Sequence, residues 1–291
     1  MAFDLTAIRD GVSYRLTAGT PFQLAKADGL FWPEVNRVTL RAPTQDGDVD
    51  YGAYLSPRLI TLSVHFYATS GSALDGYRNT FYRIFRPARS TGGFDNLGDP
   101  RFAAQSPITL KVTRDDGVVR QIGVYATGPI DIALERAHAP GNLHRAVVQL
   151  VAPNPTWFGT LTTAQYPNMG TVDPINFNHV YNGDYFGQPV FSLSGSVTAP
   201  RLINLTTGGT IRYDNVTLST ALDILTVDTI SGVSQVNGSV VVPTGTFDMS
   251  QFHFSPAPLA AGGTNNIMVS ATGAGTTATM TVSYRNRYVS Y

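Results

Sequence analysis

The clearest alternation of apolar and polar residues in the chain runs from Leu59 to Tyr67. Successive side chains of a β-strand point to opposite faces, so an alternating stretch predicts a strand with one buried face. The apolar parity comprises Ile60, Leu62, Val64 and Phe66, and the positions between them are Thr61, Ser63, His65 and Tyr67. We therefore expect a long strand here, in the core of a sheet.

Shorter runs bounded by turn residues predict more strands in the first half of the chain. The strands Val12–Thr17 and Phe22–Ala25 are expected to pair with each other around the turn Ala18–Pro21. An Asp-Gly pair predicts a hairpin turn over Arg114–Gly117. A polar loop is expected over Pro43–Asp50. The expected strands are Val12–Thr17, Phe22–Ala25, Val35–Arg41, Ile108–Thr113, Val118–Tyr125, Pro129–Leu134 and Arg145–Val151.

One segment, residues 72–86, has helical periodicity. Ser72 can cap its start, with Asp75 in the first turn, and Pro87 ends it. Its apolar stripe is formed by Leu74, Tyr77, Phe81, Ile84 and Phe85. A single amphipathic helix among strands is expected to lie across a sheet.

A corner follows the last strand of this half. Pro153 and Pro155 cannot donate hydrogen bonds to a β-ladder, so the strand must end before them. Trp157 and Phe158 come next and are expected to be packed. We interpret this stretch as the boundary between domain 1–154 and domain 155–291; the alternative is a tight turn inside one large β-domain.

Beyond the corner, short apolar runs recur between Gly, Asn and Pro residues, and no helical pattern appears. Many short strands with regular turns are typical of an antiparallel sandwich. The predicted fold class is mainly β, with a β-sandwich-like first domain that carries one helix and an antiparallel β-sandwich behind it. The expected strands are Pro189–Leu193, Arg201–Leu205, Thr210–Tyr213, Leu222–Val227, Val240–Val242, Gln251–Phe254, Asn266–Val269 and Ala278–Tyr284.

Charge changes at the corner as well. The formal net charge is zero, but 30 of the 40 charged residues lie in residues 1–152. Eighteen of the 20 basic residues are Arg, which is enriched at protein interfaces; a GC-rich genome would give the same bias. Neutral charge gives no sign of nucleic-acid or anionic-membrane binding.

Candidate chemistry is sparse. The chain has no Cys, which excludes thiol nucleophiles and disulfides, and the five His residues lack metal-ligand spacing. Asp46, Asp48 and Asp50 resemble the start of a calcium loop, but the Gly and Glu that such a loop needs are missing. We expect no catalytic, cofactor-binding or metal-binding residue, and hence no enzyme. No secretory signal or membrane-spanning run is recognised, which predicts synthesis in the cytoplasm.

Aromatic residues gather in a stretch from Tyr166 to Gly187 that is predicted to be a loop. They are Tyr166, Tyr181, Tyr185 and Phe186, together with Phe177. Two hypotheses apply: the rings stack on sugars, or the segment folds back and buries them. Long loops need packing of their own, which favours burial.

Five stretches of the chain resemble the distal tail protein family of siphophages. The strand that ends in Ala152–Trp157 is one; Gln188–Gly195 and Pro200–Gly208 are similar to that family's opening strand and to its "P-x-I-x-N-x-T-x-G" stretch. Leu222–Thr229 resembles its "L-x-I-D-T" stretch. Ala261–Ile267 resembles its "P-G-x-N-x-I" turn, although the proline is absent and the turn is longer.

The resemblance implies a structural role. In that family the first domain forms a hexameric ring that joins the tail tube to the baseplate hub and tail fibres, and a galectin-like second domain projects outward. DNA passes through without specific binding. It also implies a place in the virion, at the tail tip, without membrane insertion. Arg37, Arg41 and Arg58 flank strands next to the Pro43–Asp50 loop and are our predicted ring-interface residues. The alternative function is a carbohydrate-binding module or receptor-binding accessory protein.

Overall fold

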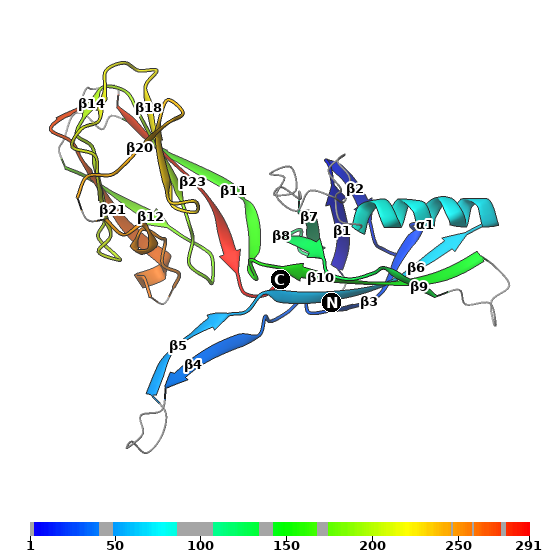
Figure 1. Ribbon diagram of the computed structural model, residues 1–291. Coiled ribbons are helices and arrows are strands. Elements are labelled where there is room, and N and C mark those ends of the chain that lie inside the picture. Colours follow the sequence, from blue (N-terminus) through cyan, green and yellow to red (C-terminus); the bar gives the residue numbers. More distant parts are fainter. Residues whose placement is uncertain are drawn as a thin grey trace, which may run out of the picture. The chain divides into compact units, whose positions relative to one another are not determined.

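The computed structural model describes residues 3–40, 49–85, 107–133, 142–167, 174–245, 247–257, 259–274 and 278–291. The chain forms two compact units, one of residues 1–157 with 289–291 and the other of residues 158–288. Within the described ranges the protein is mainly β, with one α-helix, which confirms the predicted fold class. Figure 1 labels the elements.

The first unit contains two antiparallel sheets. In one, the strand order is β2-β1-β7-β8; in the other, β6 lies between β3 and β10, and β10 also pairs with β9 and with the end of β8. The bounds are β1 Phe3–Arg9, β2 Val12–Arg15, β3 Phe22–Asp28, β6 Arg58–Ala68, β7 Ile108–Arg114, β8 Val119–Ala126, β9 Asp131–Ala133 and β10 Asn142–Ala152. A separate hairpin consists of β4 Val35–Leu40 and β5 Val49–Leu55.

The alternating apolar side chains of β6 are buried, as the sequence predicted. Ile60, Leu62, Val64 and Phe66 are all completely buried. Helix α1, Gly71–Phe85, packs over this face of β6 and β10. Its buried side chains are Leu74, Phe81, Ile84 and Phe85, so the predicted stripe is confirmed except for Tyr77, which is half-buried. Phe81 lies at the centre of an aromatic cluster, with ring centroids 4.9 Å from Phe66 and 4.7 Å from Phe85.

The start of α1 differs from the prediction in its cap. Ser70, not Ser72, accepts the hydrogen bond from a first-turn backbone amide, Ala73 N–H, at 3.3 Å. Asp75 forms an exposed ion pair with Arg78 at 3.0 Å. Ser70 and Ser72 are both serines and lie two positions apart, which is why the sequence could not tell which of them caps the helix.

The predicted pairing of the first two strands is wrong. β2 pairs with β1, a strand that the sequence analysis did not find, and β3 pairs with β6. Asp10 and Gly11 form the real turn, both with positive φ. The expected loop over Pro43–Asp50 also ends early, because β5 begins at Val49; residues 41–48 lie outside the described ranges.

The second unit is a sandwich of two antiparallel sheets. One has the order β11-β23-β13-β18-β19-β20 and the other β12-β21-β15-β16, and β17-β14-β22 form a small third sheet. The bounds are β11 Trp157–Tyr166, β12 Ile175–Val180, β13 Val190–Ser194, β14 Val197–Thr198, β15 Arg201–Asn204, β16 Thr210–Arg212, β17 Thr217–Leu218, β18 Ile224–Asp228, β19 Val233–Val236, β20 Ser239–Val241, β21 Thr264–Ser270, β22 Gly273–Ala274 and β23 Thr279–Tyr288.

The core of this unit is formed by inward side chains of both sheets. Phe191 of β13 and Val282 of β23 belong to the same buried cluster as Leu202 of β15 and Ile267 of β21. The expected strand Gln251–Phe254 is instead the end of a 3-10 turn, Met249–Gln251, followed by irregular chain. The stretch from Tyr166 to Gly187, predicted to be a loop, contains β12.

Phe81→Ala is expected to lower the free energy of unfolding by about 3–5 kcal/mol, because the ring is fully buried and its removal leaves a cavity. The measurement is denaturant unfolding. Tyr82→Ala is the matched control on the same helix: this side chain is exposed, and the loss should stay below about 1 kcal/mol. Equal losses for the two variants would contradict the packing described above.

Candidate assembly interface

The predicted corner lies where the chain leaves the first unit. β10 ends at Ala152, and the Asn154 side chain accepts hydrogen bonds from the Thr156 amide and hydroxyl. Trp157 is completely buried, and its Nε1–H donates to the Leu30 carbonyl at 3.1 Å. Pro153 and Pro155 end the hydrogen bonding of β10, and the indole of Trp157 then ties the chain to Leu30 of the first unit. Phe158 is half-buried in the second unit, with the Arg287 guanidinium over its ring.

A buried arginine organises this corner. Arg58 is 1% exposed, and its guanidinium donates five hydrogen bonds of 2.6–3.1 Å to backbone carbonyls. The acceptors are Gly29, Leu30, Pro155 and Val289. Burial lowers the pKa of Arg58 to about 10, so the group stays protonated at neutral pH. A planar fork of five donors can hold four carbonyls at once, which the three donors of a lysine cannot do.

The last residues of the chain complete the same cluster. Val289–Tyr291 belong to the first unit, although β23 before them belongs to the second. Arg120 donates to the Ser290 carbonyl, and the Tyr291 ring contacts Phe31 and Trp157 at centroid distances of 4.9 and 5.9 Å. Gly29 has a φ of +82°, and a Cβ there would collide with the Leu59 carbonyl. Only glycine fits this close approach beside Arg58.

The three arginines predicted at a ring interface lie in different environments. Arg58 is buried within its own unit and has no surface to offer a neighbouring subunit, which corrects the expectation for this residue. Arg37 is exposed on β4 and forms a 3.4 Å ion pair with Asp50. Arg41 lies outside the described residues.

The hairpin of β4 and β5, which we call the arm, is exposed on both faces. The two strands pair only with each other in the described structure, and Figure 1 shows the hairpin apart from both sheets of the first unit. Isolated two-stranded hairpins are marginally stable in water. Yet this one exposes large apolar side chains: Trp32 at its base is 70% exposed, Tyr54 57% and Val35 51%, with Val38 also exposed. Such a surface is typical of an interaction site.

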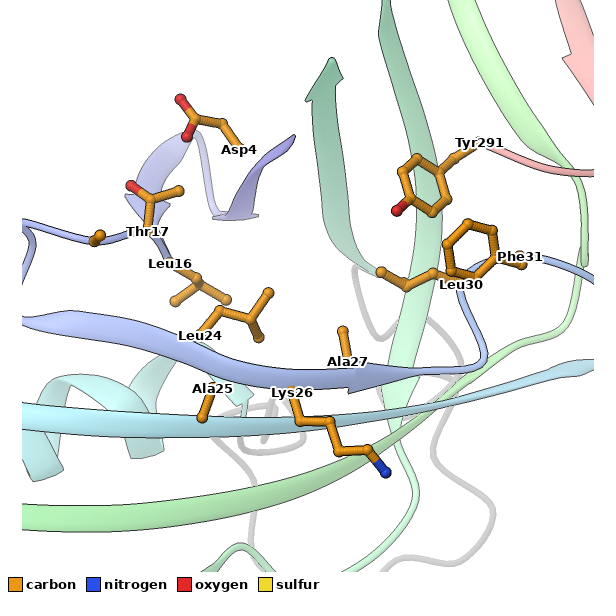
Figure 2. Close-up of a pocket in the computed structure, with 11 residues that line it drawn as sticks. Asp4, Leu16, Thr17, Leu24, Ala25, Lys26, Ala27, Leu30, Phe31 and Tyr291 are labelled. Carbon is orange, nitrogen blue, oxygen red and sulfur yellow. The ribbon is translucent and has the colours of Figure 1, made fainter. Parts of the chain in front are cut away.

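An open cleft of about 680 Å³ lies beside the base of the arm. In Figure 2, Leu16 and Leu24 lie close together below Asp4 and Thr17, and the tilted rings of Phe31 and Tyr291 lie side by side at one end. Asp4 and Thr17 provide polar groups at the other end. Asp4 is paired with Arg15 at 2.6 Å. This end is thus polar, whereas the middle of the cleft is apolar.

The aromatic residues considered for sugar stacking have partners inside the second unit. Tyr181 is 1% exposed, and its hydroxyl donates to the Tyr185 carbonyl and accepts from the Arg287 amide. The Arg287 guanidinium lies 5.0 Å from the Tyr185 ring. Half-buried Phe186 packs edge-on against His253, and half-buried Tyr166 packs against Phe177. A buried ring cannot stack on a sugar, so Tyr181 is excluded from this role.

His179 is a buried titratable group in the same unit. Its Nδ1 is 2.8 Å from the Tyr166 hydroxyl, and its ring stacks on Phe254 at 4.6 Å. Its Nε2 is buried and has no hydrogen-bond partner among the residues that the structure describes. Burial lowers the pKa of His179 below its ordinary value of 6.5, because the charged ring would lose its solvation.

The stretches that resemble the phage family contain side chains that fix turns. The Asn204 carbonyl oxygen accepts from the Thr206 and Thr207 amides, and its amide donates to the His253 carbonyl. Buried Asn265 binds both backbone groups of Ser255. These asparagines satisfy buried backbone groups, so their role in the motifs is structural rather than chemical.

No group of three or more His, Asp or Glu side chains that could hold a metal occurs among the described residues. None of the helices within the described ranges has the length and hydrophobicity needed to cross a membrane.

Arg58→Met is expected to reduce the free energy of unfolding by about 3 kcal/mol, because it removes five hydrogen bonds and leaves the part-buried carbonyls of Gly29, Pro155 and Val289 without this donor. Arg58→Lys should recover less than half of the loss if fork geometry matters, whereas full recovery would show that charge alone suffices. Arg37→Met is the control; its exposed ion pair should contribute less than about 1 kcal/mol. Denaturant unfolding with fluorescence of the buried Trp157 measures all three.

The stability of the second unit is expected to fall in mild acid. The unfolded chain binds a proton at His179 near the ordinary pKa of 6.5, and the folded chain only at lower pH. The stability that neutral His179 contributes to the folded state is therefore complete above pH 6.5, and it is lost as the pH falls from that value to the lowered pKa of the folded state. Thermal unfolding between pH 7.5 and 5 should show this loss, and His179→Gln should reduce it. An unchanged slope in the variant would contradict the assignment.

Comparison with known proteins completes the description. No protein-family model matches the sequence, and no curated protein matches it. Among solved structures, the Dit protein of phage SPP1 has a TM-score of 0.61 and 14% identity, covering 97% of this chain and 98% of that chain. It is described as a paradigm of the hub adsorption apparatus in phages that infect Gram-positive bacteria. The phage P2 baseplate in its activated conformation gives TM-scores of 0.48 with calcium (7% identity) and with strontium (6%), each covering 97% of this chain and 98% of that chain. The chain thus has the fold of the SPP1 Dit protein over nearly its whole length, which confirms the family resemblance at the level of the fold.

Proposed function

We propose that the protein is a structural component of a siphophage tail tip. In this proposal its first unit assembles into a hexameric ring that joins the tail tube to the baseplate and host-recognition proteins. The ring leaves a channel for DNA, and the second, galectin-like unit lies at the periphery of the assembly in the virion.

The observation that carries the proposal is the similarity in fold to the SPP1 Dit protein. It covers 97% of this chain and 98% of that one, so the similarity extends over the residues of both units. The turn-fixing residues Asn204 and Asn265 lie in stretches that resemble the same family.

The arm supports self-assembly. A two-stranded hairpin with apolar residues exposed on both faces is better explained by burial against a partner than by free solvation. A closed ring needs two different complementary surfaces on each subunit. The first unit has 30 charged residues of both signs in residues 1–152, which suits polar rims around such contacts.

The charge balance fits passage of DNA. A strongly basic channel would bind phosphates and resist release, whereas this chain has a formal net charge of zero. We propose no enzymatic activity, because neither the motifs nor the described side chains bring a nucleophile, base and orienting group together.

Tyr54→Asp on the arm is expected to weaken ring assembly at least tenfold, because it buries an unpaired charge in the proposed contact. Native mass measurement of the full chain, alone and mixed with tail-tube protein, tests this. Val240→Asp is the matched control: its side chain is 69% exposed on edge strand β20 of the second unit. The proposal fails if the wild-type chain remains monomeric in both conditions, or if only the control variant loses assembly.

A further inference from the structure

We infer that protonation of His179 releases the edge strand β12 from the second unit while the rest of this unit stays folded. The inference goes beyond the proposed function and holds whether or not a ring forms. It also goes further than a loss of overall stability in acid, because it names the segment that opens. His179 is a buried titratable residue, 6% exposed, that the proposed assembly does not use.

Four segments of the chain meet at the His179 ring. The ring extends from β12 and stacks on Phe254, in the irregular segment after the 3-10 turn, with centroids 4.6 Å apart. It lies edge-to-face with Tyr284 of β23 at 4.7 Å. At the end of β11, the Tyr166 hydroxyl is 2.8 Å from Nδ1. The neutral ring therefore joins β12 to the core and to β11.

The site of His179 does not suit a charged ring. A protonated ring carries an N–H on both nitrogens, and Nε2 has no acceptor among the described residues, whichever tautomer the neutral ring adopts. The aromatic faces attract a cation, but this attraction is weaker than the solvation that a buried charge loses. Burial is accordingly what lowers the pKa of His179. The charged ring is therefore more stable in water than in this site.

The neighbouring groups supply no counter-charge. The titratable side chains on the elements packed against the ring are Tyr166, Tyr181, His253 and Tyr284. Burial raises the pKa of all three phenols, so they remain neutral in acid. His253 packs on Phe186 instead, at 4.7 Å. Asn265, opposite His179 on β21, already has its side chain hydrogen-bonded to backbone groups.

Strand β12 can leave without unfolding its neighbours. In the described structure it pairs with β21 alone and forms the edge of its sheet. Its side chains alternate, so that Phe177 and His179 are buried, whereas Asn176, Asn178 and Val180 are exposed. Release of β12 removes these two side chains from the core, while β21 keeps its pairing with β15. Elements with few buried contacts open locally at a lower free energy than the core.

Hydrogen exchange of the full-length protein, followed by mass spectrometry at pH 7.5 and 5, provides the test. After correction for the intrinsic pH dependence of exchange, the amides of β12 should exchange at least tenfold faster at pH 5, while β13 and β23 stay protected. His179→Phe retains a ring that can stack on Phe254 but cannot be protonated, so its β12 should exchange equally at both pH values. His253→Phe is the matched control and should keep the wild-type response.

Several results would overturn the inference. Equal protection of β12 at both pH values in the natural protein would show that acid does not open the strand. Simultaneous loss of protection in β12, β13 and β23 would mean that the second unit unfolds as a whole. These two results need no variant, so they decide the matter even if His179→Phe fails to fold. An acid response that persists in His179→Phe, or disappears in His253→Phe, would assign the opening to another group. None of these results depends on ring assembly, which native mass measurement reports separately.

Discussion

One guanidinium holds together the place where the chain leaves the first unit and the place where it returns. Arg58 binds the Pro155 carbonyl just before the exit at Trp157 and the Val289 carbonyl just after the return. The residues between them form the second unit, so this unit is in effect an insertion near the C-terminus of the first. Burying a cation is costly unless its donors are satisfied, and here all five donors have acceptors. The same cation also holds Gly29 and Leu30, from which the chain continues into the arm.

The two units differ in how they use their side chains. In the second unit, buried polar side chains bind the backbone: Asn204, Asn265 and Tyr181 form hydrogen bonds with backbone groups of His253, Ser255 and Arg287. Among the described residues of the first unit, the arm exposes large apolar side chains and the cleft is open, and both lie close in sequence to Gly29 and Leu30, which Arg58 binds. Because Arg58 and Trp157 fix the base of the arm, its apolar residues are presented in a defined place instead of on a loose loop. Preorganised surfaces lose less entropy on association, which favours assembly.

The parts of the fold that the sequence predicted are those governed by local periodicity. The alternation in β6 and the stripe of α1 were sufficient because both elements bury one face against a single core. Arg58 lies on the same face of β6 as Ile60 and Leu62, so the alternation predicts that its side chain is buried. Its charge instead favoured a surface position, and the sequence alone could not decide between the two. The β1–β2 hairpin was missed although its turn, Asp10-Gly11, is a local signal, whereas pairings such as β10 with β6 join distant segments and are not encoded by periodicity. The return of Val289–Tyr291 to the first unit, and the cleft that Tyr291 lines, depend on tertiary packing and left no pattern in the sequence. Strand β12 was hidden by the Asn and Gly residues around it.

The central claim is that this chain builds a ring through its first unit. Cryo-electron microscopy of the full-length protein assembled with tail-tube protein tests it most directly. The account predicts a closed six-fold ring in which the first unit forms every contact around the channel and the second unit lies outside. A closed ring whose contacts are made by the second unit, or particles that remain single chains, would contradict it.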